Sequence, residues 1–239
     1  KLRQRLAAEG DLPGTSAPAA GAVDPSLRAA VRRFEQRHGL PEDGQLHADV
    51  VRELNVPVEA RLRELELNLE RWRWLPEALG EKHILVNIPS YWLAGVENGR
   101  TTISMRVVTG KTENPTPIFS DSMTTVVFSP YWNVPPSIAR KEILPALMRD
   151  SSYLGRNDME VVRGSQVVSP WSIDWNDNGY TVRQRPGPRN ALGAVKFVFP
   201  NNFDVYLHDT PADALFARRG RALSHGCVRL EQPEALAQY

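Results

Sequence analysis

The spacing of the apolar residues changes near Lys82, and this change constrains the fold more than any other feature of the sequence. Before Lys82, apolar residues recur every three or four positions, as they do on helices that bury one face. After it, short runs alternate apolar and polar residues and end at Gly, Pro or Asn, as in strands joined by turns. The sequence therefore predicts an α+β protein, with a small helical N-terminal domain and a β-rich domain over 81–239.

The helical domain is expected over residues 1–56. Its best-defined helix begins at Asp24, which suits an N-cap, and Pro25 follows at the first helical position. The helix ends at His38 and Gly39, where Gly39 suits a left-handed cap. We interpret His38 as a helix-terminal residue that the helix dipole favours, and not as a ligand. The other elements expected here are helices over 1–9 and 46–54 and a flexible connection over 10–22.

A third helical segment, over 57–80, is predicted to link the helical domain to the β-rich domain. Its apolar residues follow one another at steps of four, three, four and three. This spacing places them on one face of a helix, and we expect that face to pack on the β-rich domain or on the small domain. The stripe consists of Val58, Leu62, Leu65, Leu69 and Trp72.

The β-rich domain is expected to contain mixed sheets with a few helices. In the last of its predicted strands, apolar residues alternate with polar ones, so that Tyr206 and His208 share one face. His208 then lies at the end of a strand, where a side chain has a rigid support. The predicted strands cover residues 83–89, 91–96, 101–109, 124–130, 195–199 and 203–208.

A long excursion interrupts the strand pattern between about residues 135 and 188. It opens with a helix that Ser137 could cap and that Pro145 should kink or end. Excursions of this length inside a compact domain are often functional, so we predict a subdomain that caps the site. The alternative is a subdomain that only adds stability. Three arginines of the stretch are predicted to meet anionic peptide termini: Arg183, Arg185 and Arg189.

Charge and hydropathy restrict the partners. The 239 residues include 29 Lys and Arg against 28 Asp and Glu, and this net charge of +1 gives no field for nucleic acid. No apolar run approaches the roughly 20 residues that span a bilayer. The sequence starts at Lys1 without a signal peptide, from which we expect a trimmed or engineered start. We therefore expect membrane contact only through an N-terminal anchor outside this sequence.

The chemistry is expected to centre on Cys227, the single cysteine of the chain. One cysteine excludes an intrachain disulfide. It lies in the run Ser224-His225-Gly226-Cys227-Val228-Arg229, and fifteen residues separate Ser224 from His208. A thiol with a pKa of about 8.5 is mostly protonated at neutral pH, and a nearby imidazole can take its proton to give the nucleophilic thiolate.

The residue before the thiol, Gly226, has no Cβ, so that the backbone can turn sharply there. Free N–H groups of Gly226 and Cys227 could then point at a developing oxyanion. Two simpler interpretations compete. A lone cysteine is often a small buried apolar residue. Zinc could instead be held by His208, His225 and Cys227, but only the last two are close in sequence and no second cysteine cluster accompanies them. We therefore expect neither metal nor cofactor.

The combination of these motifs resembles the L,D-transpeptidases, with their YkuD-like catalytic domain, and above all their larger Gram-negative members. The resemblance covers roughly Asp24 to the end of the chain. The residues that carry it are His208, the Ser224–Cys227 run, and Arg229. Residues 1–56 resemble the small peptidoglycan-binding domain through Phe34, His38-Gly39-Leu40, Asp43-Gly44 and Leu54-Asn55-Val56.

The resemblance implies a β-sandwich-like catalytic domain with an inserted lid, in a periplasmic protein that an inner-membrane anchor could hold. It implies an enzyme that joins peptidoglycan stem peptides, both donor and acceptor, by 3→3 cross-links through a thioester on the cysteine. Carbapenems would acylate the same thiol. The alternatives are a hydrolase of the same fold, acting on stem peptides or lipoprotein links, and a wall-binding module without catalysis.

Residue by residue, the resemblance implies Cys227 as nucleophile and His208 as general base. The backbone carbonyl of Asp209 would orient the imidazole, with its carboxylate a bystander. The N–H groups of Gly226 and Cys227 would form the oxyanion hole. Ser224 and His225 would shape the loop, and His225 is the competing candidate for the base. The residues expected to position the substrate are Arg229 and Tyr206.

Overall fold

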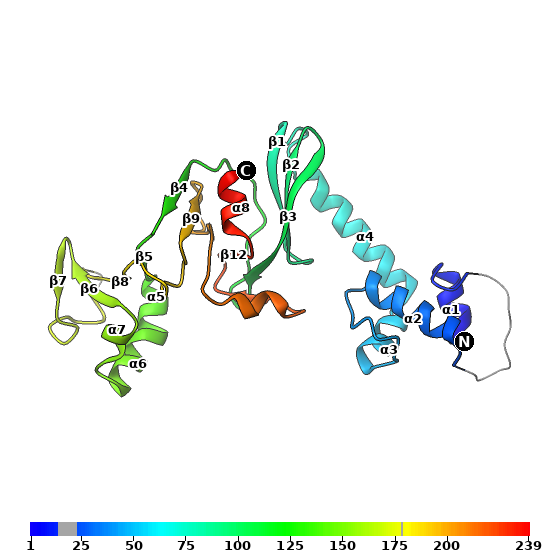
Figure 1. The fold of residues 1–239 in the computed structure, drawn as a ribbon, viewed down its shortest axis with the longest axis horizontal. Coiled ribbons are helices and arrows are strands. Elements are labelled where there is room, and N and C mark those ends of the chain that lie inside the picture. The colour runs from blue at the N-terminus through cyan, green and yellow to red at the C-terminus, as the bar shows by residue number, and fades with distance from the viewer. Residues whose placement is uncertain (14–22, 178) are drawn as a thin grey trace. The chain divides into compact units, whose positions relative to one another are not determined.

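The computed structural model describes residues 1–13, 23–177 and 179–239 (Figure 1). These residues form two compact units, Lys1–Glu77 and Ala78–Tyr239. Most of the predicted flexible connection over 10–22 lies outside the described residues. None of the helices in the described part of the chain combines the length and the apolarity needed to cross a bilayer.

The first unit is helical, as predicted. Its main helix, α2, starts where Asp24 accepts a hydrogen bond from the Leu27 N–H at 2.8 Å, with Pro25 in the first turn. It ends at His38, and Gly39 follows with a φ of +61°. The helices of this unit are α1 (Leu2–Ala8), α2 (Pro25–Arg37), α3 (Ala48–Leu54) and α4 (Val58–Arg73).

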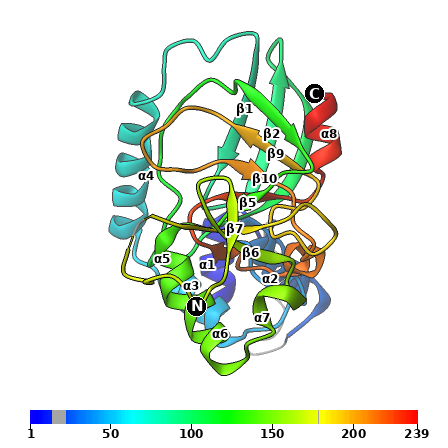
Figure 2. The ribbon, with the colours of Figure 1, turned by 90° about the vertical axis from the view of Figure 1, so that its left-hand side faces the viewer.

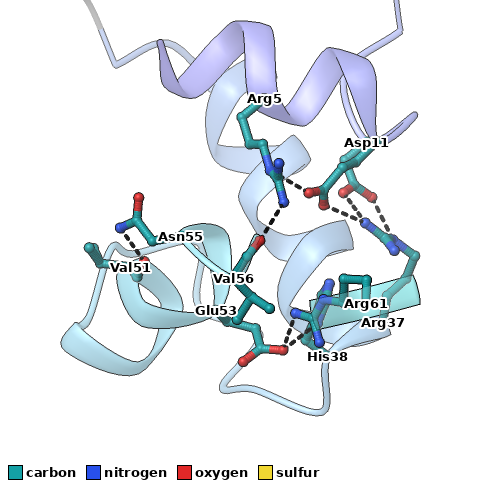
Figure 3. Close-up of polar contacts among 10 residues, drawn as sticks. Arg5, Asp11, Arg37, His38, Val51, Glu53, Asn55, Val56 and Arg61 are labelled. Atoms are coloured by element: carbon teal, nitrogen blue, oxygen red, sulfur yellow. Dashed lines mark hydrogen bonds and ion pairs between the residues drawn. The ribbon is translucent and has the colours of Figure 1, made fainter. Parts of the chain in front are cut away.

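Polar contacts fasten these helices to one another, and several of them meet at Glu53 (Figure 3). Its carboxylate pairs with Arg61 of α4 and contacts Nδ1 of His38 at 3.1 Å. The His38 ring also stacks on Phe34, with ring centroids 4.1 Å apart. His38 is thus built into the end of α2, in agreement with its interpretation as a helix-terminal residue.

The apolar stripe of α4 does not pack on the other helices of its own unit, which is one of its two predicted partners. No residue of α4 is buried, and the five stripe residues expose between 54% and 63% of their surface. Ion pairs one turn apart line the same helix, such as Arg61 with Glu64 and Arg73 with Glu70, and such pairs support a helix without a packed face. The core of the unit comes instead from α1, α2 and α3: Leu6, Leu27, Ala30, Val31, Phe34 and Val50.

The second unit is built on an eight-stranded mixed sheet, which confirms the predicted fold class. Its order is β1-β2-β3-β12-β10-β9-β4, with β11 beside β3. Helix α8 (Pro233–Gln238) lies against this sheet, and Leu236 enters its core (Figures 1 and 2). The strands are β1 (Lys82–Asn87), β2 (Trp92–Glu97), β3 (Arg100–Gly110), β4 (Thr125–Phe128), β9 (Val195–Val198), β10 (Leu207–His208), β11 (Ala222–Ser224) and β12 (Val228–Leu230).

The strand predicted over 203–208 is much shorter than expected, because only Leu207 and His208 pair as β10. The side chain of Asn201 explains the difference. Its oxygen accepts hydrogen bonds from the N–H groups of Phe203 and Val205, at 3.0 and 3.2 Å. A strand would need these groups for its own ladder, so the segment forms a loop until Tyr206.

The inserted segment forms a subdomain with its own core. Its four-stranded antiparallel sheet has the order β5-β8-β6-β7, and helices pack on it (Figure 1). Its core residues are Val134, Ala139, Ile143, Leu147, Leu154, Met159, Val161 and Val182. Its elements are β5 (Trp132–Asn133), α5 (Pro136–Ile138), η1 (Ala139–Ile143), α6 (Leu144–Arg149), α7 (Tyr153–Arg156), β6 (Met159–Arg163), β7 (Gln166–Val168) and β8 (Thr181–Gln184).

The predicted effect of Pro145 is different in the structure. The helix does not end there, since α5, the π-helical turn η1 and α6 follow one another from Pro136 to Arg149. Pro145 lies in the first turn of α6. It has no N–H to donate, and the wider turn before it lets the helix continue without that hydrogen bond. Ser137 lies inside α5 and Pro135 precedes it as N-cap, so the cap predicted at Ser137 is wrong.

Candidate active site

Three neighbouring strands build the floor of the site. In the register of β9, β10 and β12, His208 pairs with Lys196 on one side and with Arg229 on the other. The next row of the same strands, Phe197, Leu207 and Val228, is buried in the core. Successive residues of a strand point to opposite faces, so the other face carries a row of cation, imidazole and cation. Figure 2 shows β9 and β10 side by side.

The imidazole of His208 is buried and fixed in one orientation. Its Nδ1 donates a hydrogen bond to the backbone carbonyl of Asp209 at 2.5 Å. A carbonyl can only accept, so Nδ1 carries the proton and Nε2 keeps a free lone pair. Burial lowers the pKa of His208 to about 3, helped by Arg229 and Lys196, although the bond to Asp209 acts in the opposite direction. The ring is therefore neutral at pH 7 and able to accept a proton.

The carboxylate of Asp209 does not touch the imidazole. Its two oxygens accept hydrogen bonds from the N–H groups of Ala194 and Thr210, at 2.7 and 2.6 Å. A Cβ at Gly193 would lie 2.1 Å from this carboxylate, so only glycine fits there. Asp209 thus ties the start of β9 to the end of β10 and presents its backbone carbonyl to the base.

Ser224 closes the loop that carries the thiol. Its hydroxyl, 2% exposed as a residue, donates to the carbonyl of Cys227 at 2.6 Å and accepts from the N–H of Gly226 at 3.1 Å. The prediction that the Gly226 N–H is free is therefore wrong. The N–H of Cys227 makes no hydrogen bond to the described residues and stays available for an oxyanion.

Gly226 itself is needed for its backbone conformation. Its φ is +121°, which favours glycine, while an added Cβ would meet nothing nearer than 3.9 Å. The hydroxyl of Thr116 donates to the Gly226 carbonyl at 2.7 Å and accepts from the Gly110 N–H at 2.8 Å. The sequence analysis missed this threonine, which follows a Pro in a loop and belongs to no motif.

The thiol of Cys227 lies against the loop before β10. Its sulfur contacts the carbonyl oxygen of Asp204 at 3.8 Å and interacts with Tyr206. Burial raises the pKa of the thiol, while Tyr206, Lys196 and Arg229 work against this increase. Among the described residues, no hydrogen bond joins the sulfur to the His208 ring. Such bonds often tighten only when substrate is bound.

Tyr206 connects several members of the site. Its ring is 5.6 Å from that of His208, and the ammonium of Lys196 lies 3.7 Å from its centroid. Burial, followed by the neighbouring Cys227, raises its pKa, so it stays a neutral phenol. Its side chain also interacts with Trp132 of the inserted subdomain.

His225, the competing base, is turned away from the sulfur. It is exposed, and its Nε2 lies 2.8 Å from a carboxylate oxygen of Glu142, in the inserted subdomain. In the described part of the chain, no three His, Cys, Asp or Glu residues gather as metal ligands. The three residues of the zinc alternative, His208, His225 and Cys227, therefore do not form such a group.

Arg229 is the arginine that the fold brings to the thiol. Burial lowers its pKa, and its Nε is buried without a hydrogen-bond partner among the described residues. Two of the three arginines predicted to meet peptide termini have carboxylate partners inside the insert instead, since Arg183 pairs with Glu160 and Arg189 with Asp158. The role of Arg185 stays a prediction. Lys196 was not predicted as a site residue, although a charge in the middle of the apolar strand 195–199 was a usable signal.

Comparison with known proteins decides the family. Residues 81–239 match the family model described as "L,D-transpeptidase catalytic domain" (YkuD). The chain belongs to the L,D-transpeptidase family. Residues 1–54 match a second model, "Putative peptidoglycan binding domain".

Known L,D-transpeptidases resemble this chain to different degrees. A Haemophilus influenzae protein named "Putative L,D-transpeptidase" is 38% identical over 180 residues, which are 73% of this chain and 36% of that protein. The chain thus spans about a third of that relative's length. An L,D-transpeptidase of Stackebrandtia nassauensis is similar over 100% of this chain and 82% of its own, at 16% identity and a TM-score of 0.35.

L,D-transpeptidase 3 of Mycobacterium tuberculosis, solved with a faropenem-derived adduct, is similar over 63% of this chain and 51% of its own. Its identity is 16% and its TM-score 0.35.

Proposed function

We propose that this L,D-transpeptidase forms 3→3 cross-links between peptidoglycan stem peptides through a thioester on Cys227. The observation that carries the proposal is the buried, neutral His208, which Asp209 holds with Nε2 unprotonated, beside the loop of the one thiol. A cysteine with a neutral imidazole nearby is the usual equipment for acyl transfer.

In the first half-reaction, Nε2 of His208 takes the thiol proton and the sulfur adds to the carbonyl carbon of the third residue of the donor stem. The amide C–N bond to the terminal D-Ala breaks. The leaving amine receives the proton from the imidazolium, and the thioester remains. The N–H of Cys227 stabilises the oxyanion, and the peptide lies against Tyr206 and Arg229.

In the second half-reaction, the amine of another stem's diaminopimelate adds to the thioester carbonyl. His208 takes the proton of the attacking amine and returns it to the departing sulfur, so the site is ready again. Water in place of the amine gives hydrolysis, which makes the same site an L,D-carboxypeptidase. Because the acceptor decides between the two, product analysis is the measurement that separates them.

The first unit has a role of its own in the proposal. Its match to a peptidoglycan-binding model supports wall polymer as its ligand. Such a ligand would keep the catalytic unit near its substrate, in the periplasm, with an anchor in the inner membrane outside this sequence.

The proposal is tested with the intact protein and two acyl donors. A stem tetrapeptide should give cross-linked dimer and free D-Ala, and a carbapenem, whose strained amide is attacked in the same way, should add its own mass once. The Cys227→Ala variant should do neither. Peptide turnover or an adduct in this variant would contradict the proposal, as would an unmodified wild type with both donors.

A further inference from the structure

Lys196 takes no part in the chemistry described so far, yet like Arg229 it acts electrostatically on the thiol. The register places it directly beside His208, on the side opposite to Arg229. Neighbouring strands lie about 5 Å apart, so the two cations leave the sheet about 10 Å apart, with the imidazole between them. Both act electrostatically on the Cys227 sulfur.

Neither cation has an anionic partner within the part of the chain that the structure describes. No carboxylate of the described residues forms an ion pair with Lys196 or with Arg229, although Asp204 is near enough to influence Lys196. The lysine is half-buried and its ammonium rests on the Tyr206 ring. The Nε of Arg229 is buried without a partner. Withdrawing two cations from water without counter-ions is costly, and an arriving anion offsets that cost.

We propose that Lys196 and Arg229 together bind the C-terminal carboxylate of the donor peptide, on the residue that leaves. This inference rests on the proposed function and assigns two residues of its site to the binding of the donor. A guanidinium binds a carboxylate through two parallel N–H groups, and an ammonium adds a point charge. Both cations act on the sulfur, and the carboxylate of the leaving residue is the anion of the donor that lies on the leaving-group side of the scissile amide, so we assign that carboxylate to them.

The alternative role for the two cations is to stabilise the thiolate alone. In that case they would change the reactivity of Cys227 toward charged and neutral electrophiles by the same factor. A substrate-binding role changes only the reaction with an electrophile that carries a carboxylate. The ratio of the two rates therefore separates the alternatives, because the thiolate fraction cancels in it.

Iodoacetate and iodoacetamide provide this ratio. Both alkylate the thiolate with loss of iodide and formation of one S–C bond, and they differ in a carboxylate against a neutral amide. Intact-protein mass spectrometry follows each reaction on the full chain. We expect Lys196→Met to lower the iodoacetate-to-iodoacetamide rate ratio about tenfold, since hydrogen bonds to charged groups are of this strength. Lys196→Arg should retain most of the ratio.

Lys82→Met is the matched control. Lys82 also lies on a strand of the large sheet with its ammonium 4.3 Å from a tyrosine ring, that of Tyr239. It pairs with Glu97 at 3.2 Å and is three strands from β12. The iodoacetate-to-iodoacetamide rate ratio of Lys82→Met should equal that of the wild type. The iodoacetamide rate itself reports whether the thiol of each variant remains folded and accessible.

A ratio in Lys196→Met that equals those of wild type and Lys82→Met would overturn the inference. A second measurement uses peptide: a tetrapeptide with an amidated C-terminus should acylate wild type at least about tenfold more slowly than the free acid, with a smaller difference in Lys196→Met, which retains Arg229. Equal rates for acid and amide in wild type would also overturn it. Alkylation needs no turnover, so its outcome is independent of whether the protein cross-links peptides.

Discussion

The base of this site is a histidine that the fold keeps uncharged. His208 is 4% exposed and stands between two cations, and both circumstances oppose a positive ring. A charged imidazole could not take the thiol proton. The same burial that prepares the base therefore makes the folded protein sensitive to acid.

We expect the free energy of unfolding to become smaller as the pH is lowered from about 6.5. In the unfolded chain His208 binds its proton near pH 6.5, but in the folded chain only near pH 3. Between these values the unfolded state holds more protons, so stability is lost as the pH falls, by about 1.4 kcal/mol per unit from this residue. Urea unfolding at pH 4, 5 and 6 measures the slope, and His208→Gln should be less steep. Parallel slopes for the two proteins would refute the expectation.

Replacing Ser224 should loosen the loop that carries Cys227 while leaving the thiol in place. Ser224→Ala leaves the Gly226 N–H and the Cys227 carbonyl unpaired in a buried place. We expect a loss of about 1–3 kcal/mol in stability and slower acylation by a carbapenem. Ser90→Ala, at an exposed turn serine, is the control and should match wild type in both assays. If a carbapenem acylated Ser224→Ala at the wild-type rate, the loop would keep its shape without the hydroxyl.

At the scale of elements, two contacts connect the inserted subdomain to the site. Trp132 at the start of the insert interacts with Tyr206, and Glu142 of η1 contacts His225. Tyr206 is two positions from His208 along the chain, and His225 is two positions from Cys227. A movement of the insert would thus be transmitted to the site through these residues.

We expect Glu142→Gln to weaken the hold of η1 on the catalytic loop. Hydrogen exchange of residues 139–149 should accelerate by no more than about fivefold, because exposed ion pairs contribute at most about 1 kcal/mol. Exchange in β1 and β2 should not change. Lys141→Gln removes a neighbouring exposed charge and serves as control. Equal exchange in wild type and Glu142→Gln would mean that the contact does not restrain the insert.

The sequence predicted elements best where local signals agree with the packing. Asp24 and Pro25 specify the start of α2 without help from other elements, and the structure confirms them. The strand over 203–208 was overextended, since alternation cannot reveal that Asn201 binds the N–H groups of Phe203 and Val205. The π-helical turn before Pro145 was also invisible, because it depends on how the insert packs.

In the site, the motif identified the residues but not their partners. Spacing could not show that Ser224 takes the Gly226 N–H, or that Glu142, 83 positions away, faces His225. Lys196 was missed for a related reason. Lys196 is placed beside His208 by the register of β9 against β10, and register is a property of the folded sheet.

At the scale of the whole molecule, each unit has a hydrophobic core of its own. We therefore expect two unfolding transitions in calorimetry. Gly44→Ala should lower only the transition of Lys1–Glu77, since a Cβ at Gly44 would lie 2.7 Å from the Arg28 side chain and 2.9 Å from its carbonyl oxygen.

Gly39→Ala is the control for Gly44→Ala. Gly39 also has a positive φ, of +61°, but a Cβ there would meet nothing within 4 Å. Gly39→Ala should lower the stability of its unit by about 1 kcal/mol from backbone strain alone. Gly44→Ala should lower that stability by about 1–3 kcal/mol more, through overpacking. A single transition that shifts as a whole in Gly44→Ala would refute the independence of the two cores.

The strand β10 contains only Leu207 and His208, and these two residues face opposite sides of the sheet. A shift of one residue in its pairing would carry the leucine to the thiol and the imidazole into the core. Such a molecule would be wholly inactive, with no intermediate level of activity between the two registers. The specific activity of a preparation would then be proportional to the fraction of molecules with the correct register. An incompletely refolded sample would contain fewer active molecules, and each of them would work at the full rate.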